Sequence, residues 1–297
     1  MPMSLPRPTA RQGRRSIAFQ ARQSGRRQVV IKLTSQRNSY PVEAWVYREL
    51  AGTGVPVPEV RAYRARLPRV GLPCLVMSMI DGEPLFAHPL TQDAEQRLYV
   101  EVGGLLRSIH TVSLPRVRFG LGAFLPGRHL IGHADWHGFI AAYHAHPQST
   151  RYLLAQGLLP GCTDADIGLL DAALSGHCFV AVLNHGDFGP DHILVRDART
   201  VGIIDPGQAF AGPAEYDLAY LACYLSGTQF AHVLRGYDRQ VDHGKIFLYQ
   251  TVIAMHKAAR AHRAVHGERA GHFSTMARIA LSHLRSGTTS ISGTSRI

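Results

Sequence analysis

The sequence predicts an α+β fold with two lobes, a small β-rich amino-terminal lobe and a larger, mostly helical carboxy-terminal lobe. Apolar runs rich in Val and Ile, which favour strands, occur throughout the first 80 residues. Leu and Val recur at helical spacing from residue 92 onward. Three short strand-like runs between residues 179 and 204 interrupt the helical part and enclose a segment dense in His, Asp and Gly.

The amino-terminal lobe is expected to contain three strands and one helix. Residues 16–21 and 28–33 are predicted to be strands because apolar and β-branched side chains dominate them. Residues 42–51 carry apolar side chains at helical spacing, and Gly follows at the expected helix end. The apolar run 72–80 is predicted to be the third strand. It runs into Asp81-Gly82, a turn signal, so we place the lobe boundary there.

The carboxy-terminal lobe is expected over residues 82–285, after an amino-terminal lobe of residues 1–81. At 297 residues the chain has room for two such domains. Helical periodicity marks five segments, at residues 92–112, 135–146, 164–175, 214–226 and 245–266. Residues 286–297 are rich in Ser, Thr and Gly, a composition that predicts a disordered tail.

The net charge of +11 lies entirely in the first quarter of the chain. Residues 1–80 contain 14 Lys and Arg against 3 acidic residues, whereas the remainder is neutral. Nucleic acid, an acidic membrane surface or a nucleoside triphosphate could use such a basic region, and solvated arginines on an exposed sheet would explain most of it. Aromatic residues are not interleaved with the arginines, so we expect no specific nucleic-acid partner.

Compositional signals favour a cytoplasmic protein without a membrane partner. No apolar run reaches the roughly 20 residues that a membrane span requires. The basic amino-terminal stretch is not followed by the apolar stretch of a secretory signal. The four cysteines are far apart and never form Cys-x-x-Cys, which favours reduced thiols over disulfides or a zinc knuckle. We expect a monomer or a homodimer.

The segment His185-Gly-Asp-Phe-Gly-Pro-Asp-His192 carries the strongest chemical signal, and Asp205 follows it at the end of a strand-like run. Phosphoryl transfer needs one carboxylate to orient the attacking hydroxyl, and metal-held groups to neutralise the phosphate oxygens. Protein kinases use this same layout. We therefore predict Asp187 as the catalytic base, with His192 and Asp205 as the metal-binding residues. His185 is expected to brace the loop through backbone hydrogen bonds.

Lys32 and Glu43 provide a second, weaker signal. Lys32 ends the run Val-Val-Ile, and Glu43 lies in the helix predicted to follow. In kinases such a pair holds the lysine against the α- and β-phosphates of the nucleotide. A strand lysine and a helix glutamate by themselves are usually a surface ion pair of little energetic value. Together with the downstream motif, however, they predict a nucleotide-phosphate site.

Two other interpretations of the downstream motif remain open at this point. One is a β-hairpin with incidental acidic residues, which would not explain why several residue types agree at several spacings. The other is a metal hydrolase that uses His185, Asp187, Asp191 and His192 as ligands. That interpretation gives Lys32 and Glu43 no function.

These motifs resemble those of the aminoglycoside phosphotransferase family, small-molecule kinases with a bilobal protein-kinase-like fold. The segments HGDFGPDH (185–192), IID (203–205) and AGPAEYDLA (211–219) are similar to the family's His-Gly-Asp-(Leu/Phe)-x-x-x-Asn, Ile-Asp and Gly-x-Pro-x-x-Asp-Leu-Ala motifs. The earlier segments VPVPEV and LVMSMIDGEPL resemble its connector and hinge. The resemblance covers most of the chain, from residue 16 to residue 270.

The resemblance implies ATP or GTP as phosphoryl donor, together with Mg²⁺. It implies Asp187 as the base, Asp205 as a magnesium ligand, and Lys32 as the phosphate lysine with Glu43 as its partner. The adenine-binding hinge would be formed by the backbone of Ser78, Met79 and Ile80, with Met77 and Met79 as apolar walls.

Three departures from the family pattern bear on this assignment. His192 stands where the family usually has Asn, although Mg²⁺ prefers oxygen ligands, and macrolide kinases resemble this chain in carrying His there. Pro206 follows Asp205 where many members have Trp, a feature that resembles ketosamine and methylthioribose kinases. The segment before the first predicted strand is short, so Gln12-Gly13-Arg14 would have to serve as a shortened phosphate loop.

Together these features predict an ATP- or GTP-dependent O-phosphotransferase acting on a hydroxyl of a small molecule, antibiotic- or sugar-like. The alternatives are a catalytically weak nucleotide-binding regulator, a pseudokinase, and a ketosamine- or sugar-type metabolite kinase. The neutral carboxy-terminal part does not favour a strongly cationic substrate. Its histidines near Asp135 are expected to line a pocket or a helix surface, with metal binding by His133 and His137 as the alternative.

Overall fold

The computed structural model of the chain describes residues 7–8, 16–22, 28–34, 39–87, 90–127 and 132–291. The chain forms two compact units. Unit 1 comprises Met1–Ser113, His185–Phe210 and Ala231–Asp238, and unit 2 comprises Leu114–Asn184, Ala211–Phe230 and Arg239–Ile297. Because each unit combines separated stretches of chain, the lobe boundaries expected at residues 81 and 285 stay predictions.

Unit 1 contains a five-stranded antiparallel sheet with the strand order β1-β2-β3-β5-β4. Its strands are β1 (Arg7–Pro8), β2 (Ser16–Arg22), β3 (Gln28–Thr34), β4 (Val60–Arg64) and β5 (Cys74–Ser78). β2, β3 and β5 lie where strands were predicted. β4 was not predicted, because exposed Arg61 and Arg64 interrupt its apolar pattern, and it forms an edge of the sheet.

Helix α1 (Ser39–Leu50) packs on this sheet through a buried cluster. The members of the cluster are Tyr40, Ala44, Tyr47, Leu75 and Met77. Burial of a Leu or Met side chain stabilises the fold by roughly 1.5–3 kcal/mol relative to exposure. The helix ends before two glycines with φ of +87°, a left-handed conformation that glycine adopts without strain. This packing fixes the face of α1 that carries Glu43.

A second, three-stranded sheet of unit 1 consists of β6 (Glu83–Pro84), β8 (Ile193–Arg196) and β9 (Arg199–Ile203). Helix α2 (Gln92–Ile109) packs against β9. Helix α7 (Gly227–Tyr237) approaches α2 so closely that a Cβ on Gly236 would lie 1.9 Å from the carbonyl oxygen of Val100. The 3₁₀ helix η3 (Pro190–His192) precedes β8, and Asp205 follows β9, so this hairpin positions both parts of the predicted site.

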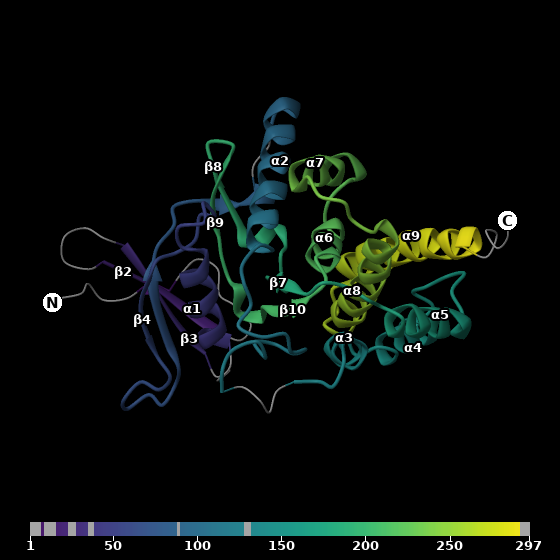
Figure 1. The fold of residues 1–297 in the computed structure, drawn as a ribbon, viewed down its shortest axis with the longest axis horizontal. Coiled ribbons are helices and arrows are strands. Elements are labelled where there is room, and N and C mark those ends of the chain that lie inside the picture. Colours follow the sequence, from purple (N-terminus) through teal and green to yellow (C-terminus); the bar gives the residue numbers. More distant parts are fainter. Residues whose placement is uncertain are drawn as a thin grey trace. The chain divides into compact units, whose positions relative to one another are not determined.

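Unit 2 is mostly helical and is centred on α8 (His243–Arg263), which packs against α4 (Gln148–Ala155), α6 (Glu215–Ala222) and α9 (Gly267–Ile291) (Figure 1). Its other elements are α3 (Trp136–His144), α5 (Asp164–Ser175) and the paired strands β7 (Val182–Asn184) and β10 (Phe210–Gly212). The bounds of α5 agree with the predicted 164–175. The expected tail, 286–297, starts within α9, and residues 292–297 lie outside the described residues.

An α+β fold with a small antiparallel sheet and a mostly helical remainder is thus confirmed. Of the described helices, none combines the length and the apolar character needed to cross a membrane.

Buried histidines in unit 2 predict a loss of stability in acid. Burial lowers the pKa of His144, His146 and His177, and it lowers the pKa of His256 from 6.5 to about 4. These side chains are neutral in the folded protein, whereas the unfolded chain binds protons at higher pH. We therefore expect the unfolding temperature to fall as the pH decreases from about 6.5 to about 4.

The matched variant for this prediction is His256→Asn. His256 Nδ1 donates to the carbonyl oxygen of His144 at 2.7 Å, and an asparagine amide retains a donor but does not titrate. The fall in unfolding temperature should be smaller in this variant. An unfolding temperature that is flat over the same pH range in the wild type would contradict the prediction.

Candidate active site

The predicted contact between Lys32 and Glu43 is present at the interface of β3 and α1. Lys32 Nζ donates to both carboxylate oxygens of Glu43, at 2.8 and 3.0 Å. Both residues are buried, with Glu43 fully inaccessible. Burial disfavours the charge on Lys32, but Asp205 and Glu43 outweigh it and raise the pKa of the ammonium group. Lys32 is therefore a fixed cation held on a rigid strand.

Asp205 joins this pair from the end of β9. Its Oδ1 accepts a third hydrogen bond from Lys32 Nζ, at 3.0 Å. The residue has φ of +64° and ψ of +45°, a left-handed conformation that aspartate adopts more readily than most side chains. Its side chain remains 45% exposed. Burial would favour the protonated form, yet Lys32 and His192 hold the pKa of Asp205 well below its usual range, so it is ionised.

The loop that carries Asp187 is held by His185. His185 Nε2 donates to the carbonyl oxygen of Ile204 at 3.0 Å, and its Nδ1 accepts from the backbone N–H of Asp187 at 3.3 Å. The imidazole thus joins the Asp187 loop to the residue before Asp205, the bracing role predicted for it. Asp187 Oδ2 accepts a hydrogen bond from Gln208 Nε2 at 3.3 Å.

His192 lies between Asp187 and Asp205. Its Nδ1 donates to the backbone carbonyl oxygen of Asp187 at 2.7 Å, and its Nε2 lies 3.9 Å from Asp205 Oδ2. Burial opposes protonation, but Asp187 and Asp205 outweigh it and raise the pKa of His192. The structure therefore brings together Lys32, Glu43, Asp187, His192 and Asp205 within unit 1.

The segment predicted to be the adenine hinge includes the end of β5 and the residues after it. The Ser78 N–H donates to Glu59 O, and the Met79 N–H donates to Gln28 O. Met77 belongs to the buried cluster beneath α1. The Ile80 side chain packs over Gly202, where an added Cβ would lie 2.7 Å from Ile80 Cδ1. The backbone N–H groups of two predicted hinge residues, Ser78 and Met79, are thus already hydrogen-bonded within the protein. Contact between this segment and an adenine stays a prediction.

Two further polar residues of the site were not predicted. Tyr47 lies one helical turn after Glu43, donates to Glu43 Oε1 at 3.0 Å and accepts from the Asp205 N–H at 2.9 Å. Gln208, which contacts Asp187, follows Asp205 by three residues. Helical spacing from Glu43 was the one signal available for Tyr47, and an apolar helix face accounts for it equally well. The segment proposed as a phosphate loop, Gln12-Gly13-Arg14, lies outside the described residues.

Gly186 is required by the close approach of two loops. Its φ is +80°, and a Cβ would lie 2.3 Å from the carbonyl oxygen of Gln208. We expect Gly186→Ala to separate the Asp187 loop from η4 (Pro206–Gln208), lowering both the unfolding temperature and any transfer activity. The measurement is thermal unfolding beside Gly157→Ala, a glycine with φ of +67° and no atom within 4 Å of the added Cβ. Equal losses in the two variants would contradict the steric explanation.

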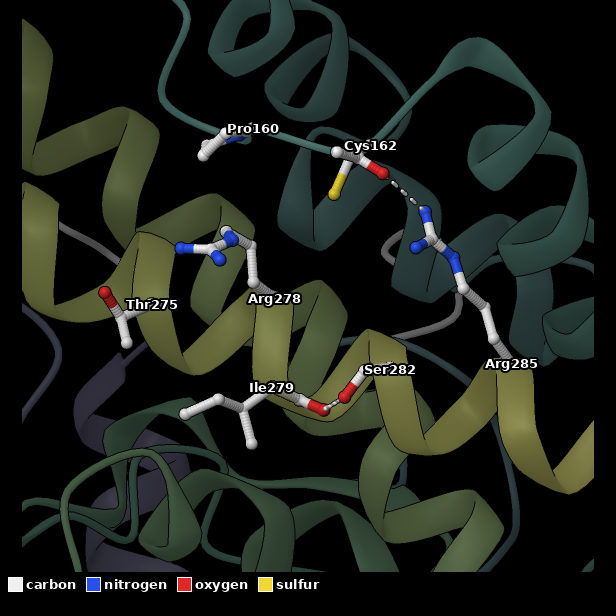
Figure 2. Close-up of a pocket in the computed structure, with 8 residues that line it drawn as sticks. Pro160, Cys162, Thr275, Arg278, Ile279, Ser282 and Arg285 are labelled. Atoms are coloured by element: carbon white, nitrogen blue, oxygen red, sulfur yellow. Dashed lines mark hydrogen bonds between the residues drawn. The ribbon is translucent and has the colours of Figure 1, made fainter.

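A surface hollow in unit 2 offers no comparable chemistry. It lies between the Pro160–Cys162 loop and one face of α9, which carries Thr275, Arg278, Ile279, Ser282 and Arg285 (Figure 2). Arg285 is already paired with Asp166, with a closest distance of 2.6 Å. Burial and Asp166 raise the pKa of the Cys162 thiol despite both arginines, so it remains protonated.

Two of the described histidines near Asp135 contact a carboxylate. His137 Nε2 and His146 Nε2 lie 3.4 and 3.3 Å from Asp171 Oδ1. Among the residues that the structure describes, no three His, Cys, Asp or Glu side chains converge as metal ligands.

The fold is similar to solved phosphotransferase structures over nearly the whole chain. A thermostable mutant of aminoglycoside phosphotransferase APH(4)-Ia, in a ternary complex with ADP and hygromycin B, is 20% identical with a TM-score of 0.72, covering 96% of this chain and 95% of that chain. The GDP complex of wild-type aminoglycoside 2'-phosphotransferase-IIIa is 17% identical with a TM-score of 0.67, covering 95% and 94%. Spectinomycin phosphotransferase APH(9)-Ia, in complex with ADP and spectinomycin, is 14% identical with a TM-score of 0.65, covering 93% and 92%.

These likenesses confirm the predicted bilobal, protein-kinase-like fold. No curated protein matches the chain. The model of the phosphotransferase enzyme family matches residues 10–252, a range that contains the five residues grouped in unit 1. The expected class of enzyme, a phosphotransferase, is therefore confirmed. The chain belongs to the phosphotransferase enzyme family.

Proposed function

We propose that the protein transfers the terminal phosphoryl group of ATP or GTP to a hydroxyl of a small molecule, antibiotic- or sugar-like. The observation that carries this proposal is the convergence of Lys32, Asp205, His192 and Asp187 within one unit. Lys32 is 3.0 Å from Asp205, Asp205 is 3.9 Å from His192, and His192 is 2.7 Å from the Asp187 backbone. Cation, metal-type carboxylate and base are the groups that phosphoryl transfer requires.

Asp187 is the proposed base because Lys32 is hydrogen-bonded to Glu43 and Asp205, whereas the Asp187 carboxylate accepts from the neutral amide of Gln208 and lies 3.7 Å from His192 Nδ1. Its side chain is 24% exposed, so a hydroxyl can reach it. The Gln208 amide and the His185 contact to its backbone restrict its orientation. A carboxylate held this way can orient the acceptor hydroxyl and take its proton as the new P–O bond forms.

Lys32 is the proposed phosphate ligand. Glu43 holds its ammonium group at the end of β3, so little conformational freedom is lost when a phosphate binds. The hydrogen bond from Lys32 to Asp205 places the ammonium group next to the carboxylate proposed to bind Mg²⁺. Bound phosphate oxygens would accept a hydrogen bond from the same ammonium group.

Asp205 fits a magnesium ligand, and His192 fits one less well. Mg²⁺ is commonly bound by one or two carboxylates together with waters and substrate phosphates, and the half-exposed carboxylate of Asp205 suits that arrangement. His192 has only Nε2 available, because its Nδ1 donates to Asp187, and an imidazole nitrogen ligates only when unprotonated. When bound, the ion would neutralise charge on the phosphate oxygens. We assign Asp205 as the principal ligand and His192 as the neighbouring one.

The acceptor is proposed from the neighbours and from composition. The similar structures include a complex with hygromycin B and one with spectinomycin. The neutral charge of residues 81–297 favours a weakly charged acceptor over a polycation. Hydroxylated antibiotics and sugars are accordingly the first candidates.

A screen of acceptors tests this function. Purified protein would be incubated with Mg²⁺ and either ATP or GTP, with a panel of hydroxylated antibiotics and sugars, and products analysed by mass spectrometry. We expect one class of acceptor to gain a phosphate group with stoichiometric release of nucleoside diphosphate. Nucleotide binding without turnover of any acceptor would instead support the regulator, for which the imidazole of His192 is the specific argument.

A further inference from the structure

Tyr47 connects the Lys32–Glu43 pair to Asp205, whose carboxylate is proposed to bind Mg²⁺. Its side chain is 1% exposed and belongs to the buried cluster beneath α1. Its hydroxyl donates to Glu43 Oε1 at 3.0 Å and accepts from the backbone N–H of Asp205 at 2.9 Å. A phenol has one proton to donate and lone pairs to accept with, so both capacities are used.

The two hydrogen bonds of Tyr47 close a circuit. Lys32 Nζ donates to Glu43 at 2.8 Å and to Asp205 Oδ1 at 3.0 Å. Glu43 is thus joined to the carboxylate of Asp205 through Lys32, and to its backbone through Tyr47. The side chain and the backbone of Asp205 are therefore both linked to the buried carboxylate of Glu43, the first through Lys32 and the second through Tyr47.

This double attachment matters because Asp205 has a left-handed backbone. Its φ is +64°, in a region that a residue other than glycine occupies at some energetic disadvantage. The bond from Lys32 orients only the carboxylate, and the side chain could keep it while the backbone relaxed. The bond to Tyr47 holds the peptide N–H, and with it the conformation from which the carboxylate projects.

We propose that Tyr47 is a positioning residue for metal binding, whose hydroxyl holds the backbone of Asp205 in the conformation that presents its carboxylate to the ion. A core aromatic side chain without this role would be replaced by phenylalanine with no effect beyond stability. Because Asp205 is a metal ligand only if the proposed function holds, the test separates the two claims.

The binding test compares Tyr47→Phe with Tyr237→Phe. Tyr237 is also buried in unit 1 and hydrogen-bonds His110 Nδ1 at 2.8 Å, so its variant loses an equivalent hydroxyl outside the site. Affinity for AMP-PNP and GMP-PNP would be measured by calorimetry with and without Mg²⁺. In Tyr47→Phe we expect Mg²⁺-dependent tightening to shrink about tenfold, as for other partners of metal ligands. Metal-free affinity should change less, because Lys32 keeps both of its hydrogen bonds to Glu43.

Amide exchange provides a readout that needs neither metal nor nucleotide. Ile204 N–H donates to His192 O, Asp205 N–H donates to Tyr47, and Pro206 has no N–H. In a proteolytic peptide that ends at residue 206, Asp205 therefore carries the last exchangeable backbone amide. This amide should be protected in the wild type and in Tyr237→Phe, and should exchange at least about tenfold faster in Tyr47→Phe.

The outcomes distinguish the claims. An unprotected Asp205 amide in the wild type overturns the role of Tyr47 even if Tyr47→Phe does not fold. The proposed role of Tyr47 is also overturned if Mg²⁺ increases the nucleotide affinity of Tyr47→Phe as much as that of the wild type. A wild type that binds neither nucleotide analogue overturns the proposed function, and with it the metal-positioning role, although protection at Asp205 would still verify the hydrogen bond.

Discussion

Asp187→Asn should abolish phosphoryl transfer while leaving nucleotide binding intact. Asparagine has nearly the same shape but cannot take a proton from the acceptor hydroxyl, and a general base typically contributes about 10²–10⁴-fold to the rate. Lys32 and Asp205, the main groups proposed to bind Mg²⁺-nucleotide, are hydrogen-bonded to each other, and the substitution leaves both side chains in place. The measurements are product formation by mass spectrometry and nucleotide affinity by calorimetry.

The matched control is Asp197→Asn. Asp197 is exposed in the turn between β8 and β9 and has φ of +51°, a conformation that asparagine adopts as readily. This variant undergoes the same chemical change in the same unit and should retain full activity. Transfer by Asp187→Asn at the rate of this control would show that Asp187 is not the base.

Among the proposed variants, Lys32→Met should lower the free energy of unfolding the most. It leaves the fully buried carboxylate of Glu43 without its cation, and loss of one partner of a buried pair typically costs about 3–5 kcal/mol. The double variant Lys32→Met/Glu43→Gln removes the stranded charge and should recover most of that free energy. Neither variant should bind the nucleotide phosphates. Urea unfolding and nucleotide calorimetry measure the two effects separately.

The nucleotide affinity of the double variant distinguishes the two interpretations of this ion pair. A purely structural ion pair and a nucleotide-binding pair would give the same recovery of stability, but only the second predicts that nucleotide affinity stays lost. Equal stability of the single and the double variant would mean that the carboxylate of Glu43 is solvated or neutral in the single variant. Tight nucleotide binding by the double variant would remove Lys32 from the site.

The groups proposed to carry the chemistry could be located from the sequence because short-range spacing relates them. Asp187 and His192 share one loop, and Lys32 and Glu43 lie on consecutive elements whose periodicity is clear. Tyr47 and Gln208 could not be found this way, since their roles depend on contacts to Asp205 and Asp187 across the fold. A tyrosine on an apolar helix face looks like core until its hydroxyl has a partner.

The same distinction holds for the fold. Segment 164–175 has apolar spacing and an acidic first turn after Thr163, and it was predicted to the residue. β4 was missed because it is an edge strand, where charged side chains are common, and its arginines obscure the alternation. Helix α9 was missed because Gly267 looks like the end of a helix. In the structure α8 already ends at Arg263, and Gly267 is the first residue of α9.

The most direct test of the active site is a crystal structure with Mg²⁺ and a non-hydrolysable ATP or GTP analogue. The arrangement in unit 1 predicts Lys32 Nζ on the α- or β-phosphate with Glu43 still bound to it, and Asp205 on the ion. It also predicts the Asp187 carboxylate on the open side of the terminal phosphate. A nucleotide bound away from Lys32, or an ion held without Asp205, would contradict it.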